Sequence, residues 1–153
     1  MARGLETTEW QPRLAVPTLS NAMDVGDPSN FIRILEIFHH RFKDLQDVFS
    51  SCSISDDETK TTLKSVYQTS QYLLDPHGAV GFKALQDYLQ KHTGKKGIVL
   101  ETAHPVKFYD VVEPVIGKPV PVPESIRSQL NLEKKSTKIN AEGDLLKEFL
   151  LSL

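Results

Sequence analysis

Several features that would place a chain in a special class are missing from this sequence. It holds one cysteine, Cys52, in 153 residues, which excludes a disulfide within the chain and fits a reducing compartment. It has no apolar run long enough to span a bilayer, and its first residues lack the apolar core of a signal peptide. Its 18 basic and 20 acidic residues give no concentrated positive face for nucleic acid or an anionic membrane. We therefore predict one domain in the cytoplasm, with no nucleic-acid or membrane partner.

Side-chain patterns typical of metal sites and of nucleophilic catalysis are also missing. His39 and His40 are adjacent on a predicted helix and point in different directions, whereas a helical zinc pair needs ligands four residues apart. Cys52 lies in a serine-rich stretch with no histidine close to it in sequence. The turn from Gly94 to Gly97 lacks the spacing of a phosphate-binding loop. We expect no metal ligand and no nucleophile among these residues.

Hydrophobic periodicity is present and predicts a helix-rich chain. The clearest helix is expected from Asp27 to about Ser50, with Asp27 as N-cap and Pro28 in the first turn. Its apolar positions recur at three- and four-residue steps, which puts them on one face: Phe31, Ile34, Leu35, Phe38, Phe42, Leu45, Val48 and Phe49. Such a face must be buried against something.

Local signals predict the remaining helices. Ser55 and Glu58 have the spacing of a capping box and should open a second helix. Asp75-Pro76 predicts the cap and first turn of a third, which should end around residues 92–94. The small residues at its start, Gly78, Ala79 and Gly81, would allow another segment to approach closely. A fourth helix is expected from Pro105 to Gly117, and a short final one over residues 144–153.

Two short apolar runs are predicted to be strands. Residues 98–100 are interpreted as a buried strand, and residues 14–19 as a second, with Pro17 favouring an edge or an end. The predicted class is α/β, as one unit over residues 1–153: a leading segment and motif loop (1–26), helices with a buried strand (27–117), and an irregular tail with a last helix (118–153). Two strands do not make a sheet that covers these helices, which indicates part of a larger protein. A small α-rich domain that folds alone remains the alternative.

The segment from Glu101 to Phe108 is the most informative for chemistry. A strand ends at Thr102 and a helix begins three residues later, and ligands gather at the carboxyl ends of strands in open α/β sheets. One interpretation is that Thr102 faces a ligand. The other is that its hydroxyl caps the following helix. A second stretch, residues 21–30, holds Asn21 and Asp24 around a tight turn, and turn chemistry accounts for it without a ligand.

Three segments in order resemble the threonine synthase family. They are TLSNAMDVGDPSNFIR (18–33), DPHGAVGFKAL (75–85) and ETAHPVKF (101–108), the last similar to a family motif written T-A-H-P-x-K-F. The likeness runs from about Trp10 to the C-terminus and is to bacterial members. It implies the C-terminal portion of a fold-type II pyridoxal-phosphate enzyme. Such an enzyme converts O-phospho-L-homoserine and water to L-threonine and phosphate, with the cofactor as electron sink.

Site residues follow from the resemblance only where the motifs match. It implies that Thr102 hydrogen-bonds the pyridine nitrogen of the cofactor. His104 and Asp75 are expected near the site, and Asn21 and Asp24 at the pocket wall. Structural hydrogen bonding away from the cofactor is the alternative for these four.

One departure from the family is large. The Schiff-base lysine lies in a motif like F-H-G-P-T-x-A-F-K-D, and nothing in this chain resembles it. Lys107 belongs to the later motif and is not that lysine. We therefore expect no catalytic residue here, and an inactive chain unless the missing N-terminal part of the enzyme joins it. The alternatives are a related phospho-lyase and a non-catalytic interaction module.

Overall fold

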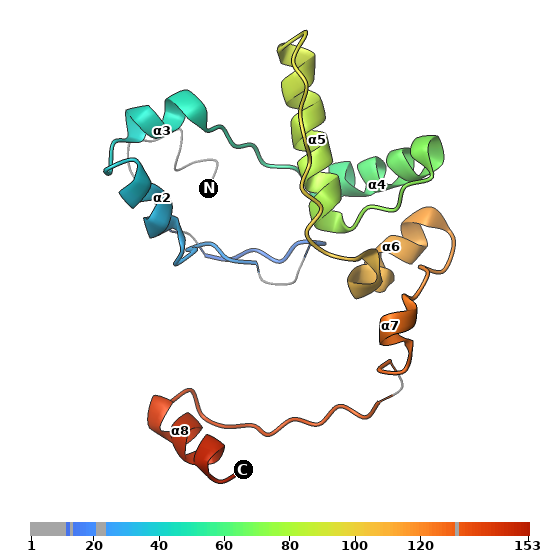
Figure 1. Cartoon of the computed structure of the whole chain (residues 1–153). Coiled ribbons are helices and arrows are strands. Elements are labelled where there is room, and N and C mark those ends of the chain that lie inside the picture. Colours follow the sequence, from blue (N-terminus) through green and yellow to red (C-terminus); the bar gives the residue numbers. More distant parts are fainter. Residues whose placement is uncertain (1–11, 13, 21–23, 131) are drawn as a thin grey trace. The chain divides into compact units, whose positions relative to one another are not determined.

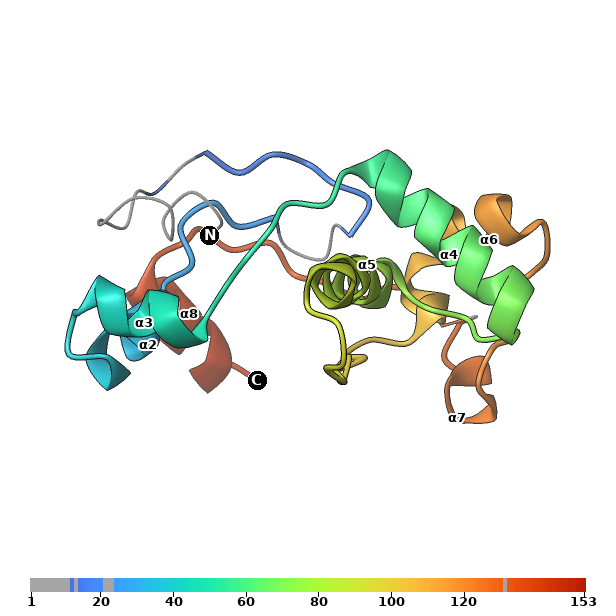
Figure 2. The same cartoon turned by 90° about the horizontal axis from the view of Figure 1, so that it is seen from above.

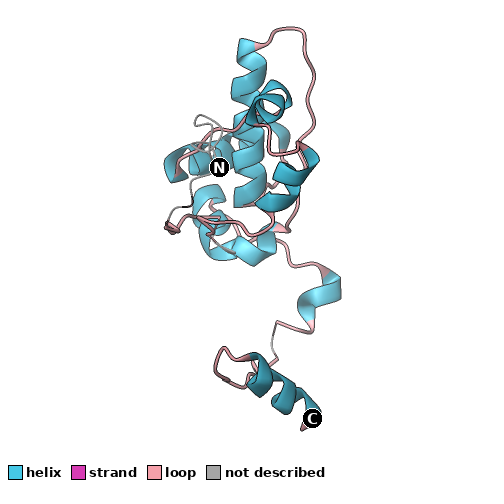
Figure 3. Cartoon of the chain, turned by 90° about the vertical axis from the view of Figure 1, so that its left-hand side faces the viewer, coloured by secondary structure: helices cyan, strands magenta, loops and turns pink. Residues whose placement is uncertain are grey.

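The computed structural model describes residues 12, 14–20, 24–130 and 132–153. The contacts divide the chain into two units, Met1–Pro121 and Val122–Leu153, and each is described by itself. Every regular element in the described residues is helical (Figure 3). None of these helices is long and apolar enough to cross a membrane.

The predicted first helix is two short helices in the structure. They are α2 (Phe31–Ile37) and α3 (Phe42–Val48), and α2 begins after Asn30 rather than after Asp27 (Figure 1). His39 and His40 have φ values of 51° and 55°, a left-handed conformation that a right-handed helix cannot continue. The prediction of one continuous helix is therefore wrong, because periodicity alone does not register a reversal of the chain.

Part of the predicted apolar face is buried, whereas Val48 and Phe49 at its end are 72% and 37% exposed. Phe31 and Leu45 are 3% and 1% exposed and make one cluster, with three partly buried neighbours: Ile34, Leu35 and Phe38. The turn between the helices brings Phe31 and Leu45 together although they are far apart along the sequence. The same hydrophobic stripe thus serves two short helices packed on each other.

The centre of the first unit is the pair α4 (Asp56–Ser70) and α5 (Pro76–Lys91), which pack together (Figures 1 and 2). The capping box predicted at the start of α4 is confirmed: the Glu58 N–H donates to Ser55 Oγ, and the Ser55 N–H donates to Glu58 Oε2 at 2.8 Å. Asp75 caps α5, as predicted. A small buried cluster joins the two helices: Leu63, Val66, Leu74 and Ala79.

The helix predicted from Pro105 is confirmed, with a 3-10 first turn. This turn, η1 (Pro105–Phe108), leads into α6 (Tyr109–Ile116), which packs against α4. Gly117 ends α6 with a φ of 70°, a conformation that favours glycine. Phe108, Val112 and Val120 form the buried cluster of this region.

The two predicted strands are absent from the described residues. Residues 14–19 and 98–100 form no ladder, and Ile98 and Leu100 are 88% and 79% exposed rather than buried. A strand needs a neighbour that accepts its N–H groups and donates to its carbonyls, and no such neighbour lies among the described residues. The helix-rich part of the predicted class is therefore confirmed, and the strand part is corrected.

Two helices lie in the described residues of the second unit. α7 (Glu124–Arg127) interrupts the stretch predicted to be irregular, and α8 (Gly143–Leu151) is close to the predicted final helix. Neither helix has a buried residue. At the end of α8, Leu151 and the nearby Leu153 are 79% and 87% exposed. Leu151 and Leu153 therefore have no covering surface among the described residues of this unit.

Candidate functional site

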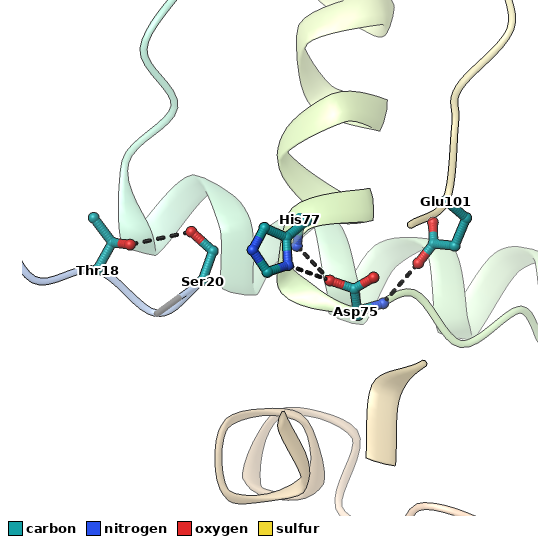
Figure 4. A network of polar contacts seen from close by, with 5 residues as sticks. All are labelled: Thr18, Ser20, Asp75, His77 and Glu101. Atoms are coloured by element: carbon teal, nitrogen blue, oxygen red, sulfur yellow. Dashed lines mark hydrogen bonds and ion pairs between the residues drawn. The ribbon is translucent and has the colours of Figure 1, made fainter. Parts of the chain in front are cut away.

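The start of α5 is held by a fully buried carboxyl group. The side chain of Asp75 is 0% exposed, and its Oδ1 accepts two hydrogen bonds from His77: from the backbone N–H at 2.7 Å and from ring Nδ1 at 2.8 Å (Figure 4). An aspartate at the N-cap supplies an acceptor to a helical N–H that has no partner within the helix. Asp75 Oδ2 is also buried and has no hydrogen-bond partner in the described part of the chain.

Glu101 lies against this helix start from a distant segment. Its Oε1 accepts the backbone N–H of Asp75 at 3.0 Å (Figure 4). Its carboxyl group occupies the space beside Gly78, where a Cβ would come within 2.0 Å of Oε2. The close approach that the small residues of α5 predicted is therefore confirmed, and Glu101 is the residue that makes it.

The electrostatics of Glu101 follow from this placement. Burial of its carboxyl end raises its pKa above the ordinary value, and contact with the Asp75 side chain acts in the same direction. The backbone N–H of Asp75 and the ring of His77 oppose the rise. Glu101 is an exposed residue overall, but its carboxyl group packs on the backbone of α5. Low-dielectric surroundings therefore act on the group that titrates.

Thr102 follows Glu101 directly, and it does not cap the next helix. The cap of η1 is His104, whose Nδ1 accepts the Val106 N–H at 3.1 Å. The capping interpretation of Thr102 is therefore wrong. Thr102 is exposed, and its hydroxyl forms no hydrogen bond with any residue that the structure describes. This hydroxyl is free to contact another group.

An open pocket lies beside this segment. It has a volume of about 380 Å³ and is lined by Tyr72, Leu73, Glu101, Ala103, His104, Pro105 and Pro121. His104 and Glu101 both line it, and Glu101 also accepts the backbone N–H of Asp75. Glu101 and Ala103, the two sequence neighbours of Thr102, therefore both line this pocket.

The remaining predicted site residues lie in the segment before α2. Asp24 accepts the Thr18 backbone N–H at 3.1 Å and the Thr18 hydroxyl at 2.6 Å, and that hydroxyl also meets Ser20 at 3.1 Å (Figure 4). The Leu19 N–H donates to Asp56 at 3.2 Å, which ties the segment to the start of α4. Asn21 lies outside the described residues.

Sequence reasoning missed Glu101 and His77. His77 contacts Asp75, and its ring also meets the ring of Phe108 edge-on with centroids 5.1 Å apart. Neither residue stands in a motif that requires its chemistry. The available signal was indirect: glycine at position 78 indicated a close neighbour, and an acidic residue beside Thr102 was one candidate for it.

Comparison with known proteins finds similarity to one family. A family model described as threonine synthase, C-terminal, matches residues 78–150. Threonine synthase from Haemophilus influenzae is 40% identical over 149 residues, which are 97% of this chain and 34% of that protein. The crystal structure of Escherichia coli threonine synthase superposes with a TM-score of 0.83 at 32% identity, over 98% of this chain and 34% of that one. The chain matches the C-terminal part of the threonine synthase family.

A second solved threonine synthase carries the cofactor. The Brucella melitensis enzyme, solved with pyridoxal phosphate bound, superposes with a TM-score of 0.79 at 27% identity, over 97% of this chain and 37% of that one. The resemblance stated from three sequence segments is therefore confirmed. The chain spans about a third of the length of the threonine synthases that it matches.

Proposed function

We propose that this chain supplies the C-terminal part of a pyridoxal-phosphate-dependent threonine synthase in the cytoplasm. The reaction converts O-phospho-L-homoserine and water to L-threonine and phosphate. Support comes from similarity over 97% of the chain to threonine synthase and from the cofactor-bound relative. The chain has no match to the Schiff-base lysine motif, so a further part of the enzyme must provide that lysine.

The residue proposed to meet the cofactor is Thr102. The observation that carries this proposal is its exposed hydroxyl without an internal partner, in a segment anchored on both sides. On one side Glu101 accepts the Asp75 N–H, and on the other Phe108 contacts His77. A hydroxyl can donate a hydrogen bond to a neutral pyridine nitrogen, and unlike a carboxylate it does not strongly hold a proton there. When bound, the cofactor supplies an electron sink for the substrate's α and β carbons.

The other predicted residues support this arrangement from further away. Asp75 and His104 use their side chains as helix caps, and Asp24 holds Thr18. We propose structural roles for these three. The proposed protein partner is the N-terminal part of the enzyme, which would cover the apolar residues that the described chain leaves exposed, such as Ile98 and Leu100.

A chimaera tests the proposal directly. The N-terminal two thirds of the Haemophilus influenzae enzyme would be joined to this chain, and threonine and phosphate formation measured with O-phospho-L-homoserine. We expect turnover from the chimaera and none from the 153-residue chain alone. Release of phosphate with a four-carbon product other than threonine would instead favour a phospho-lyase. Cooperative, soluble folding of the chain alone, with no turnover by the chimaera, would favour a non-catalytic interaction module.

A pair of threonine variants tests the role of Thr102. Both variants are made in the chimaera. In Thr102→Val we expect lower turnover, with the visible absorption band of the bound cofactor retained, because only the contact to the ring nitrogen is lost. Thr93→Val is the matched control, since Thr93 is also exposed and lies in the turn after α5. Equal turnover of the two variants would remove Thr102 from the site.

A further inference from the structure

The oxygen Asp75 Oδ2 raises a question that the proposed function does not answer. A buried carboxylate oxygen without a donor costs free energy, because it loses its hydrogen bonds to water. Asp75 is fully buried, and its other oxygen already accepts two bonds from His77. No N–H or O–H group of the described residues reaches Oδ2.

The neighbour that can meet this oxygen is the carboxyl group of Glu101. It accepts the Asp75 N–H through Oε1, and its carboxyl carbon lies 2.5 Å from where a Cβ of Gly78 would be, at the same helix start. Figure 4 shows the two carboxyl groups side by side. Two ionised carboxyl groups that contact each other repel, whereas one proton between them makes a donor and an acceptor.

We propose that Asp75 and Glu101 are a positioning pair for Thr102: one proton held between their carboxyl groups satisfies Asp75 Oδ2 and fixes the Glu101–Thr102 segment on the start of α5. That Thr102 then meets the cofactor rests on the proposed function. The pair itself does not, because all its contacts lie within this chain. The pair also requires glycine at position 78, since any Cβ there would displace Glu101.

The charged surroundings are compatible with a proton held at Glu101. Asp75, the N-cap of α5, and His77 in its first turn are the charged groups that act on it. Tyr72 and His104 line the adjoining pocket. Burial and Asp75 raise the pKa of Glu101, while His77 and the Asp75 N–H lower it, and the net direction is upward. The folded chain therefore binds this proton more tightly than the unfolded chain. Its stabilising contribution is complete below the ordinary value of 4.5 and is lost as the pH rises through the folded pKa.

Amide replacements test the shared proton on the full 153-residue chain. In Glu101→Gln the side-chain NH₂ can donate to Asp75 Oδ2 while the amide oxygen accepts the Asp75 N–H, so the contacts persist without a proton. The melting temperature of the parent chain minus that of Glu101→Gln should fall as the pH rises above 4.5, because all other titrating groups are shared. Glu133→Gln, a change at an exposed glutamate in the second unit, should show no such pH step.

NMR of the same chain tests the shared proton and the positioning of Thr102 separately, through the Glu101 carboxyl signal and the Thr102 amide signal. The Glu101 carboxyl carbon should titrate above the ordinary glutamate range. The amide signal of Thr102 should be dispersed in the parent and in Glu101→Gln, and should move toward random-coil values in Glu101→Ala. Titration of Glu101 at the ordinary value, or equal damage from Gln and Ala, would overturn the shared proton. An unchanged Thr102 signal in Glu101→Ala would overturn the positioning role. None of these readouts needs the cofactor, so failure of the chimaera would count against the proposed function alone.

Discussion

Gly78→Ala is the substitution for which the structure makes the sharpest stability prediction. Alanine in place of glycine within a helix ordinarily stabilises a protein by about 0.5–1 kcal/mol, because the unfolded chain loses conformational freedom. At position 78 the new Cβ would lie 2.0 Å and 2.4 Å from the two carboxyl oxygens of Glu101. These atoms end a flexible side chain, so Glu101 would swing away rather than distort the helix.

The displacement has a calculable cost. It removes the acceptor of the Asp75 N–H, which belongs to a residue that is 0% exposed. A buried donor left without a partner costs about 1–3 kcal/mol. After the gain from alanine is subtracted, Gly78→Ala should destabilise the chain by up to about 2.5 kcal/mol, with a central value of about 1 kcal/mol. Urea unfolding followed by helical circular dichroism would measure the difference.

The same helix offers a matched control. A Cβ at Gly81 would meet only Val99 Cγ1 at 3.4 Å, an ordinary contact. Gly81→Ala should therefore stabilise the chain by about 0.5–1 kcal/mol. In a Glu101→Ala background the cost of Gly78→Ala should disappear, because the displaced group is already gone. A Gly78→Ala chain that is stabilised as much as Gly81→Ala would refute the close approach of Glu101.

Three further predictions concern packing, capping and exposed apolar surface. Leu63→Ala, at a core residue that is 1% exposed, should cost about 2–5 kcal/mol in urea unfolding, whereas Lys64→Ala on the exposed side of the same helix should change little. Ser55→Ala should cost about 1 kcal/mol by removing the N-cap of α4. Because Ser55 lowers the pKa of Glu58, the capping box should stabilise α4 above pH 4.5 and weaken as the pH falls through the folded pKa. Ile98→Glu should reduce binding of a hydrophobic dye to the isolated chain without loss of helical signal, since Ile98 is 88% exposed; unchanged dye binding would show that the apolar surface lies elsewhere.

Local signals predicted the helices well where the cap chemistry is written in adjacent residues. Ser55 with Glu58 and Asp75 with Pro76 place the starts of α4 and α5, because an N-cap depends on contacts within one turn. Gly117 ends α6 for an equally local reason. The break between α2 and α3 escaped prediction because the apolar spacing continues through it, and a left-handed conformation such as that of His39 and His40 is uncommon outside glycine.

The site was predictable only in part, because some of its contacts join residues that are distant in sequence. Thr102 was found because its segment matches a family motif, and its free hydroxyl agrees with a ligand-facing role. Glu101 was missed because its importance comes from Asp75 and Gly78, which lie more than 20 residues away in sequence. The only sequence signal of such a contact is a residue without a side chain at the place of approach, here Gly78.

The two missing strands and the exposed apolar residues have a common explanation. Residues 98–100 are apolar like a buried strand, yet Ile98 and Leu100 are exposed in the described chain. Backbone hydrogen bonding in a strand and burial of its side chains are both supplied by neighbouring segments, so a sequence can specify a strand that it cannot complete alone. The helices escape this limit, since their backbone bonds close within each element. The contrast predicts that, in the chimaera, amides of residues 98–100 become protected from hydrogen exchange while those of α4 change little. Equal protection of residues 98–100 in the isolated chain would show that their partner lies within these 153 residues after all.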